Sequence, residues 1–123
     1  MVNPKLLQPQ EVEVWYILPA IRRELSIKMK ELGLEQKEIA KILGVSAAAI
    51  SHYFTNKRAK DVRFNQDIKK EITTSADEII RDNSKMTTEV QKLLKTVWAN
   101  KVVCNIHKMH GNVDESCEVC FQK

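Results

Sequence analysis

The sequence predicts an all-α protein of five helices that ends in a short tail containing cysteine and histidine. Three observations lead to this fold class. Apolar residues recur at helical spacing over most of the chain. Only 3 Gly and 3 Pro are available, too few for the many turns of a sandwich or barrel. The hydrophobic share of the 123 residues is 43%, which is typical of a globular chain.

The expected first helix begins near Pro19, where a missing backbone N–H costs nothing, and ends at Gly33. Its apolar residues follow at helical spacing: Ile21, Leu25, Met29 and Leu32. Residues 1–14 precede it with two prolines and little periodicity, so we expect them to form an N-terminal arm.

Two short helices are expected next, over about 35–43 and 46–54. Gly44 between them can adopt the left-handed conformation of a tight turn. Ser46 is a suitable N-cap for the second helix, and Ala40 is small enough for that helix to cross close to it. Five apolar residues would lock the pair at a steep angle: Ile39, Leu43, Val45, Ile50 and Tyr53. This pattern predicts a helix-turn-helix, which we assign to residues 15–64.

Residues 65–103 are expected to form two amphipathic helices that complete the core and hold a dimer. Asn65 would cap the first, over about 66–82, and a Thr88–Gln91 capping box would open the second, over about 88–103. Their apolar stripes are Ile68, Ile72, Ala76, Ile79 and Ile80, and Val90, Leu93, Leu94, Val97 and Trp98.

The net charge of +4 lies wholly in residues 1–63, because residues 64–123 hold equal numbers of acidic and basic side chains. A basic loop, Lys57-Arg58-Ala59-Lys60, directly follows the second motif helix. This asymmetry indicates that the first half binds a polyanion, and a merely solvated basic face is the alternative.

The stretch from Val14 to Arg63, including GLEQKEIAKILGVSAAAISHYFTNKR, resembles the Cro/repressor-like (Xre-type) helix-turn-helix family, and more narrowly its archaeal regulators with a C-terminal cysteine cluster. The resemblance implies a homodimeric transcriptional regulator that binds a pseudo-palindromic operator in double-stranded DNA. It implies phosphate contacts from Gln36, Asn56, Lys57 and Arg58, and base reading by Ala47, Ala48, Ser51 and His52.

Two of these four base-reading positions are alanines, which can offer only apolar contact to a thymine methyl. Direct readout should therefore be modest, with polar contacts from Ser46, Ser51 and His52. Backbone contacts and DNA deformability should carry more of the specificity.

Residues 104–123 are expected to form a tail that binds a metal ion or an iron–sulfur cluster. Cys104-x2-His107 and Cys117-x2-Cys120 supply a Cys3His donor set, with His110 as a competing donor. An odd number of cysteines in a cytosolic chain argues against a disulfide framework. Both a [4Fe–4S] cluster that senses redox state or iron and a structural Zn2+ suit these donors. The cluster is favoured, because the chain has no separate sensing domain and the resembling archaeal regulators carry such cysteines.

Other classes of function are less well supported by the sequence. No paired carboxylates, Ser/His/Asp set or phosphate-cradling glycine loop is visible, so we expect neither an enzyme nor a small-molecule substrate. No apolar stretch is long enough for a membrane span, and no secretory signal is visible, so the expected location is the cytoplasm. An antitoxin-like interaction module is an alternative, since Xre-type domains also occur in such proteins.

Overall fold

The computed structural model describes residues 8–55, 62–100 and 102, and within them it contains helices and no strand, which confirms the all-α class. The helical elements, in chain order, are α1 (Pro9–Val12), a π-helical turn η2 (Glu13–Ile17), α2 (Leu18–Glu31), α3 (Gln36–Leu43), α4 (Ala47–Thr55), α6 (Gln66–Arg81), the 3-10 turn η3 (Asn83–Lys85) and α7 (Met86–Ala99).

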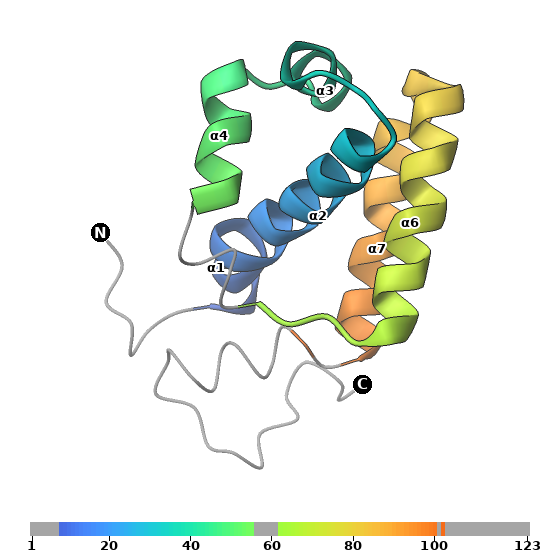
Figure 1. Ribbon diagram of the computed structural model, residues 1–123. Helices are drawn as coiled ribbons and strands as arrows, with labels where there is room; N and C mark the ends of the chain where they lie inside the picture. The colour runs from blue at the N-terminus through green and yellow to red at the C-terminus, as the bar shows by residue number, and fades with distance from the viewer. Residues whose placement is uncertain (1–7, 56–61, 101, 103–123) are drawn as a thin grey trace.

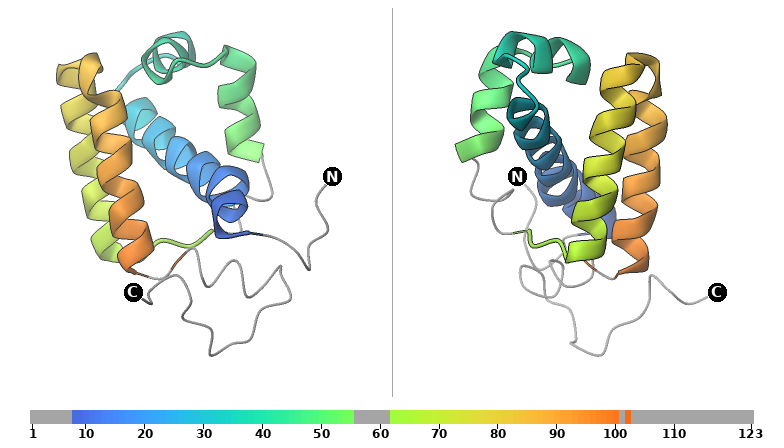
Figure 2. Two further views of the ribbon diagram at one scale, coloured as in Figure 1. Left: turned by 180° about the vertical axis from the view of Figure 1, so that it is seen from behind. Right: turned by 45° about the vertical axis from the view of Figure 1, so that its right-hand side comes forward.

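Helix α2 is the centre of the arrangement (Figure 1). It contacts α3 and α4 on one side and α6 on the other. Helices α6 and α7 run antiparallel as a hairpin, which both views of Figure 2 show side by side. The helix pair α3–α4 is therefore presented on the opposite side of α2 from the hairpin.

The helical run at the N-terminus starts earlier than the sequence suggested. Pro9, not Pro19, is the first helical residue, and the chain stays helical through η2 into α2. Residues 9–14, which were expected to belong to an arm, are thus helical, and Val12 is fully buried. The reason is burial: Val12, Tyr16 and Ile17 join the core, although their spacing gives only a short apolar stripe.

The start of α7 also differs from the expectation. Thr88 lies inside the helix, so the predicted Thr88–Gln91 capping box is wrong. Asp82 instead accepts hydrogen bonds from the backbone N–H and the hydroxyl of Ser84, at 3.0 and 2.7 Å. This Asx-type cap starts η3, which leads directly into α7 and moves the helix start to Met86.

The apolar stripes predicted for α6 and α7 lie in one common core. The fully buried or nearly buried members are Ile68, Ile72, Ala76, Ile79, Leu93, Leu94 and Val97, while Ile80, Val90 and Trp98 are partly buried. Among the described residues, the large apolar side chains that stay exposed are Val14 and Leu32, and neither is on this hairpin. Leu32 therefore departs from the predicted stripe, because α2 ends at Glu31 and the chain turns away at Leu32.

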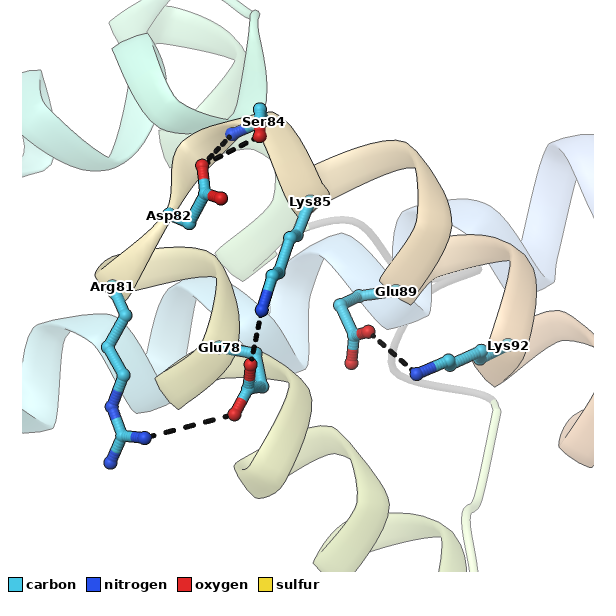
Figure 3. Close-up of polar contacts among 7 residues, drawn as sticks. All are labelled: Glu78, Arg81, Asp82, Ser84, Lys85, Glu89 and Lys92. Atoms are coloured by element: carbon cyan, nitrogen blue, oxygen red, sulfur yellow. Dashed lines mark hydrogen bonds and ion pairs between the residues drawn. The ribbon is translucent and has the colours of Figure 1, made fainter.

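The turn between α6 and α7 is held by an ion-pair network (Figure 3). Glu78 lies 3.0 Å from Lys85 and 3.8 Å from Arg81, measured between charged atoms. The hydrogen bond from Lys85, with its charge, keeps the pKa of the Glu78 carboxyl below its ordinary value and raises the pKa of Lys85. On α7 the buried carboxylate of Glu89 pairs with Lys92 at 3.1 Å.

The C-terminal end of α7 is tied to distant parts of the chain. The indole N–H of Trp98 donates a hydrogen bond to the Glu13 carboxylate in η2. Asn65, at the cap of α6, donates to the side-chain oxygen of Asn100 at 3.0 Å. Val102 is buried as well. The end of α7 is therefore fixed both to η2 and to the start of α6.

Candidate nucleic-acid interface

The turn between α3 and α4 has the geometry that the sequence predicted. Gly44 has φ +71° and ψ 31°, in the left-handed region that glycine adopts most readily. The backbone N–H of Val45 donates to the carbonyl of Ala40 at 3.0 Å, which closes the last turn of α3. Ser46 then caps α4, since its hydroxyl accepts from the backbone N–H of Ala49 at 3.1 Å.

The predicted small core between the two helices is also present. Ile39, Leu43, Ile50 and Tyr53 are buried, and Val45 packs against them while partly exposed. Ala40 is 5% exposed, as expected where a second helix crosses closely. These contacts fix the angle at which α4 is held.

Packing this inner face leaves the opposite face of α4 in solvent. Ala47, Ala48, Ser51 and His52 lie on this side, together with the cap Ser46, and none of them is buried. Residues three and four apart lie on the same side of a helix, so these side chains form one surface. We call Ser46, Ala47, Ala48, Ser51 and His52 the α4 face. All five are residues that the sequence assigned to DNA contact.

Gln36 joins α3 to the α4 face. Its side-chain amide donates to the backbone carbonyl of Ala47 at 2.9 Å and to the hydroxyl of Ser51 at 2.6 Å. The sequence placed Gln36 at a phosphate-contacting position but did not predict these bonds. They connect residues 11 and 15 positions apart, which no local pattern reveals.

The N-terminus of α3 is more acidic than a phosphate site would favour. The carboxylate of Glu38 accepts from the backbone N–H of Glu35 at 3.2 Å and so occupies one donor of the helix end. Lys37, exposed in the same turn, is a nearby cation that the sequence pattern did not single out. On α2, Lys30 lies 5.6 Å from the centroid of the Phe54 ring, so a second cation stands beside α4.

The remaining predicted site residues lie outside the described part of the chain. They are Asn56, Lys57 and Arg58 of the basic loop, and Cys104, His107, Cys117 and Cys120 of the tail. Within the described residues, no group of three or more His, Cys, Asp or Glu side chains is placed to hold a metal ion. The helices described here also include none that is long and apolar enough to cross a membrane.

Comparison with known families agrees with this geometry. Residues 25–64 match a family described as helix-turn-helix. The match covers the C-terminal part of α2, both helices of the motif and the segment that follows α4. No curated protein and no solved structure matches the chain. Residues 25–64 are therefore similar to a helix-turn-helix domain, and the second helix of the matched motif is α4.

Proposed function

We propose that the protein is a sequence-specific, double-stranded-DNA-binding transcriptional regulator that inserts the α4 face into the major groove. The observation that carries this proposal is the helix-turn-helix match over residues 25–64, together with the solvent exposure of the α4 face. A major groove about 12 Å wide admits one α-helix, and the second helix of this motif is the one that enters it.

The side chains of the α4 face suit close approach to base edges. Ala47 and Ala48 are small enough to let the helix backbone lie deep in the groove, where their methyl groups can contact thymine. Ser46, Ser51 and His52 add polar groups. Because the α4 face has few long polar side chains that could contact bases, base contacts supply part of the sequence specificity, and DNA shape supplies the rest.

Phosphate contacts are assigned to cations that are close to the motif helices in the sequence. Lys57 and Arg58, with Asn56, follow α4 in the sequence. Lys37 stands at the start of α3, beside Gln36. Such contacts orient the domain on the duplex and make its affinity strongly dependent on salt.

A charge placed on the α4 face tests this proposal. Ala48→Glu should abolish binding to duplexes that the wild-type protein selects from a randomised library, because the carboxylate would face phosphates and base acceptors. Thr73→Glu adds the same charge at an exposed position of α6 and should leave binding unchanged. Circular dichroism should show both variants folded. Wild-type affinity in a folded Ala48→Glu protein would rule out α4 as the recognition helix.

We further propose that the protein binds as a twofold homodimer on a pseudo-palindromic operator. A single domain of this kind covers too little DNA for tight specific binding. Most of the α6 and α7 stripes are buried within the chain, but Ile80, Val90 and Trp98 are only partly buried and could contribute to the contact between the two copies. Light scattering of the protein–duplex complex should give two chains per operator, and one chain per operator would refute the dimer.

The C-terminal tail is proposed to hold a [4Fe–4S] cluster through Cys104, Cys117 and Cys120, with His107 as fourth ligand. Three thiolates and an imidazole also suit a structural Zn2+. A bound cluster would supply sensitivity to oxidants, and the tail follows in the sequence directly after α7, whose Trp98 is bonded to Glu13. Iron, sulfide and zinc content of anaerobically purified protein decides between the two. One equivalent of zinc without iron or sulfide would leave only the structural role.

A further inference from the structure

An open cleft lies where α2, the end of α3 and the start of α7 come together, and the left view of Figure 2 shows these three helices. Its volume is about 270 Å³. Sites for drug-sized molecules typically have about 300–1,000 Å³, so this cleft suits only a small ligand. None of the described residues that line it belongs to the α4 face.

The walls of the cleft are mainly apolar. They are formed by one or more apolar side chains from each of the three helices: Leu18, Leu43, Met86 and Val90. Leu43 is buried, whereas the other three are only partly buried, so a ligand would cover apolar surface that water now reaches. The cleft therefore favours a ligand with an apolar body.

Arg22 gives the cleft a positive charge. It carries the one full charge among the described residues that line the cleft. No ion pair joins Arg22 to any described residue, although the neighbouring Arg23 pairs with Glu24 at 3.2 Å. A half-buried guanidinium without an acidic partner favours an anion, and its planar N–H groups match the two oxygens of a carboxylate.

Two neutral polar side chains also line the cleft. Thr87 and Gln91 lie one turn apart on α7, and both are exposed. Within the described part of the chain, neither side chain has a hydrogen-bond partner. The hydroxyl and the amide NH2 can both donate, so they add to the donors that Arg22 offers to a carboxylate.

We propose that this cleft binds a small organic carboxylate with an apolar body, and that binding changes the affinity of the α4 face for DNA. The apolar body would contact Leu43, which also belongs to the small core between α3 and α4. A ligand that binds one arrangement of these helices more tightly than another shifts the protein toward that arrangement. The effect on DNA rests on the proposed function, whereas binding of the carboxylate does not.

Phenylacetate and hexanoate are the probes, with the amide phenylacetamide as a neutral compound of matched shape. Titration of the full-length protein with either carboxylate should shift the methyl resonances of Leu18, Leu43, Met86 and Val90. The dissociation constant should be in the millimolar range, as expected for a small ligand in an open cleft. Phenylacetamide should bind several-fold more weakly than phenylacetate, because it carries no charge.

Arg22→Gln tests the contact with the carboxylate. It should weaken phenylacetate binding by about five- to tenfold, the effect of one charge-assisted hydrogen bond, and leave phenylacetamide binding unchanged. Arg81→Gln removes the same charge at an exposed position at the end of α6, outside the cleft. This control should bind phenylacetate as the wild-type protein does.

The effect on DNA is measured with duplexes that the wild-type protein selects from a randomised library. Saturating phenylacetate should change the affinity for a selected duplex by about fivefold or more. Acetate at the same concentration, which lacks the apolar body, controls for ionic strength and should have a smaller effect. In Arg22→Gln the same concentration of phenylacetate should change the affinity less than in the wild-type protein.

Four results would overturn the site itself. They are no shift of the cleft methyl groups with either carboxylate, shifts confined to α4, equal binding of phenylacetate and phenylacetamide, and an Arg22→Gln variant that changes the oligomeric state but not phenylacetate binding. The last result would assign the cleft to a contact between two copies of the chain.

Two further results separate regulation from the proposed function. Phenylacetate that binds in the cleft but leaves the affinity for a selected duplex unchanged would overturn the regulatory effect alone. A wild-type protein that prefers no duplex over a scrambled one would overturn the proposed function and the regulation with it. The methyl titration needs no DNA, so it would still decide whether the cleft binds a carboxylate.

Discussion

Gly44 shows how one residue determines the placement of the α4 face. Its positive φ of 71° lets the chain reverse within two residues, between the end of α3 and the cap at Ser46. A Cβ added at Gly44 would meet no atom within 4 Å. The requirement for glycine is therefore conformational and not one of space.

Gly44→Ala should for this reason destabilise the protein by about 1–2 kcal/mol, the cost of a left-handed L-residue. Gly44→Asn should cost less, because asparagine tolerates this conformation. Chemical denaturation of both variants measures the difference. Equal stability of alanine, asparagine and glycine at this position would mean that the turn does not have the left-handed geometry.

Gln36 shows the limit of reading residues one at a time. Its position in the motif could be predicted from the sequence, and so could the exposure of Ser51. The bonds to Ala47 and Ser51 could not, because they arise only when the core between α3 and α4 fixes the distance between the two helices.

Among the elements, the α6–α7 hairpin has a stability that should depend on pH. The pKa of Glu78 is lowered below its ordinary value of 4.5, mainly by the hydrogen bond from Lys85. A carboxyl with a depressed pKa stabilises the folded state above its unfolded pKa, and this contribution is lost as the pH falls through the folded value. The raised pKa of Lys85 gives the opposite dependence, with stabilisation below 10.5 that is lost as the pH rises through the folded value.

Glu78→Gln should therefore lower Tm at pH 7, and the difference from wild type should shrink below pH 4.5. The ion pair also requires the charge of Lys85, so the Tm difference should shrink again above pH 10.5, as Lys85 loses its proton. Asp77→Asn is the matched control, since Asp77 is exposed and pairs with no described cation. Thermal melts across pH test this, and a constant Tm difference between pH 3 and pH 7 would contradict the assigned pairing.

Element types could be predicted well from the sequence, and element boundaries less well. The stripes of α6 and α7, the caps at Ser46 and Asn65 and the turn at Gly44 all follow local rules, and the structure confirms them. The starts of the first and last helices do not follow such rules. Burial of Val12 extends the N-terminal helix, and the Asp82 cap displaces the one expected at Thr88.

For the whole molecule, the distribution of charge predicts how DNA binding responds to salt. Replacing Lys57 and Arg58 together by glutamine should weaken binding to all duplexes almost equally. The slope of log affinity against log salt should fall by about 1 for each phosphate that the protein no longer neutralises. Lys95→Gln, at an exposed position of α7, serves as a control cation away from α4. An unchanged salt slope in the double variant would show that the loop does not contact the DNA backbone.

The central claim is that the α4 face meets DNA, and amide chemical shifts of the full-length protein test it most directly. Titration with a selected duplex should perturb the amides of α4 and of the first turn of α3, around Ser46–His52 and Gln36. The amides on the outer side of the α6–α7 hairpin should stay nearly unchanged. Perturbations concentrated on α6 and α7, with α4 unaffected, would contradict the account.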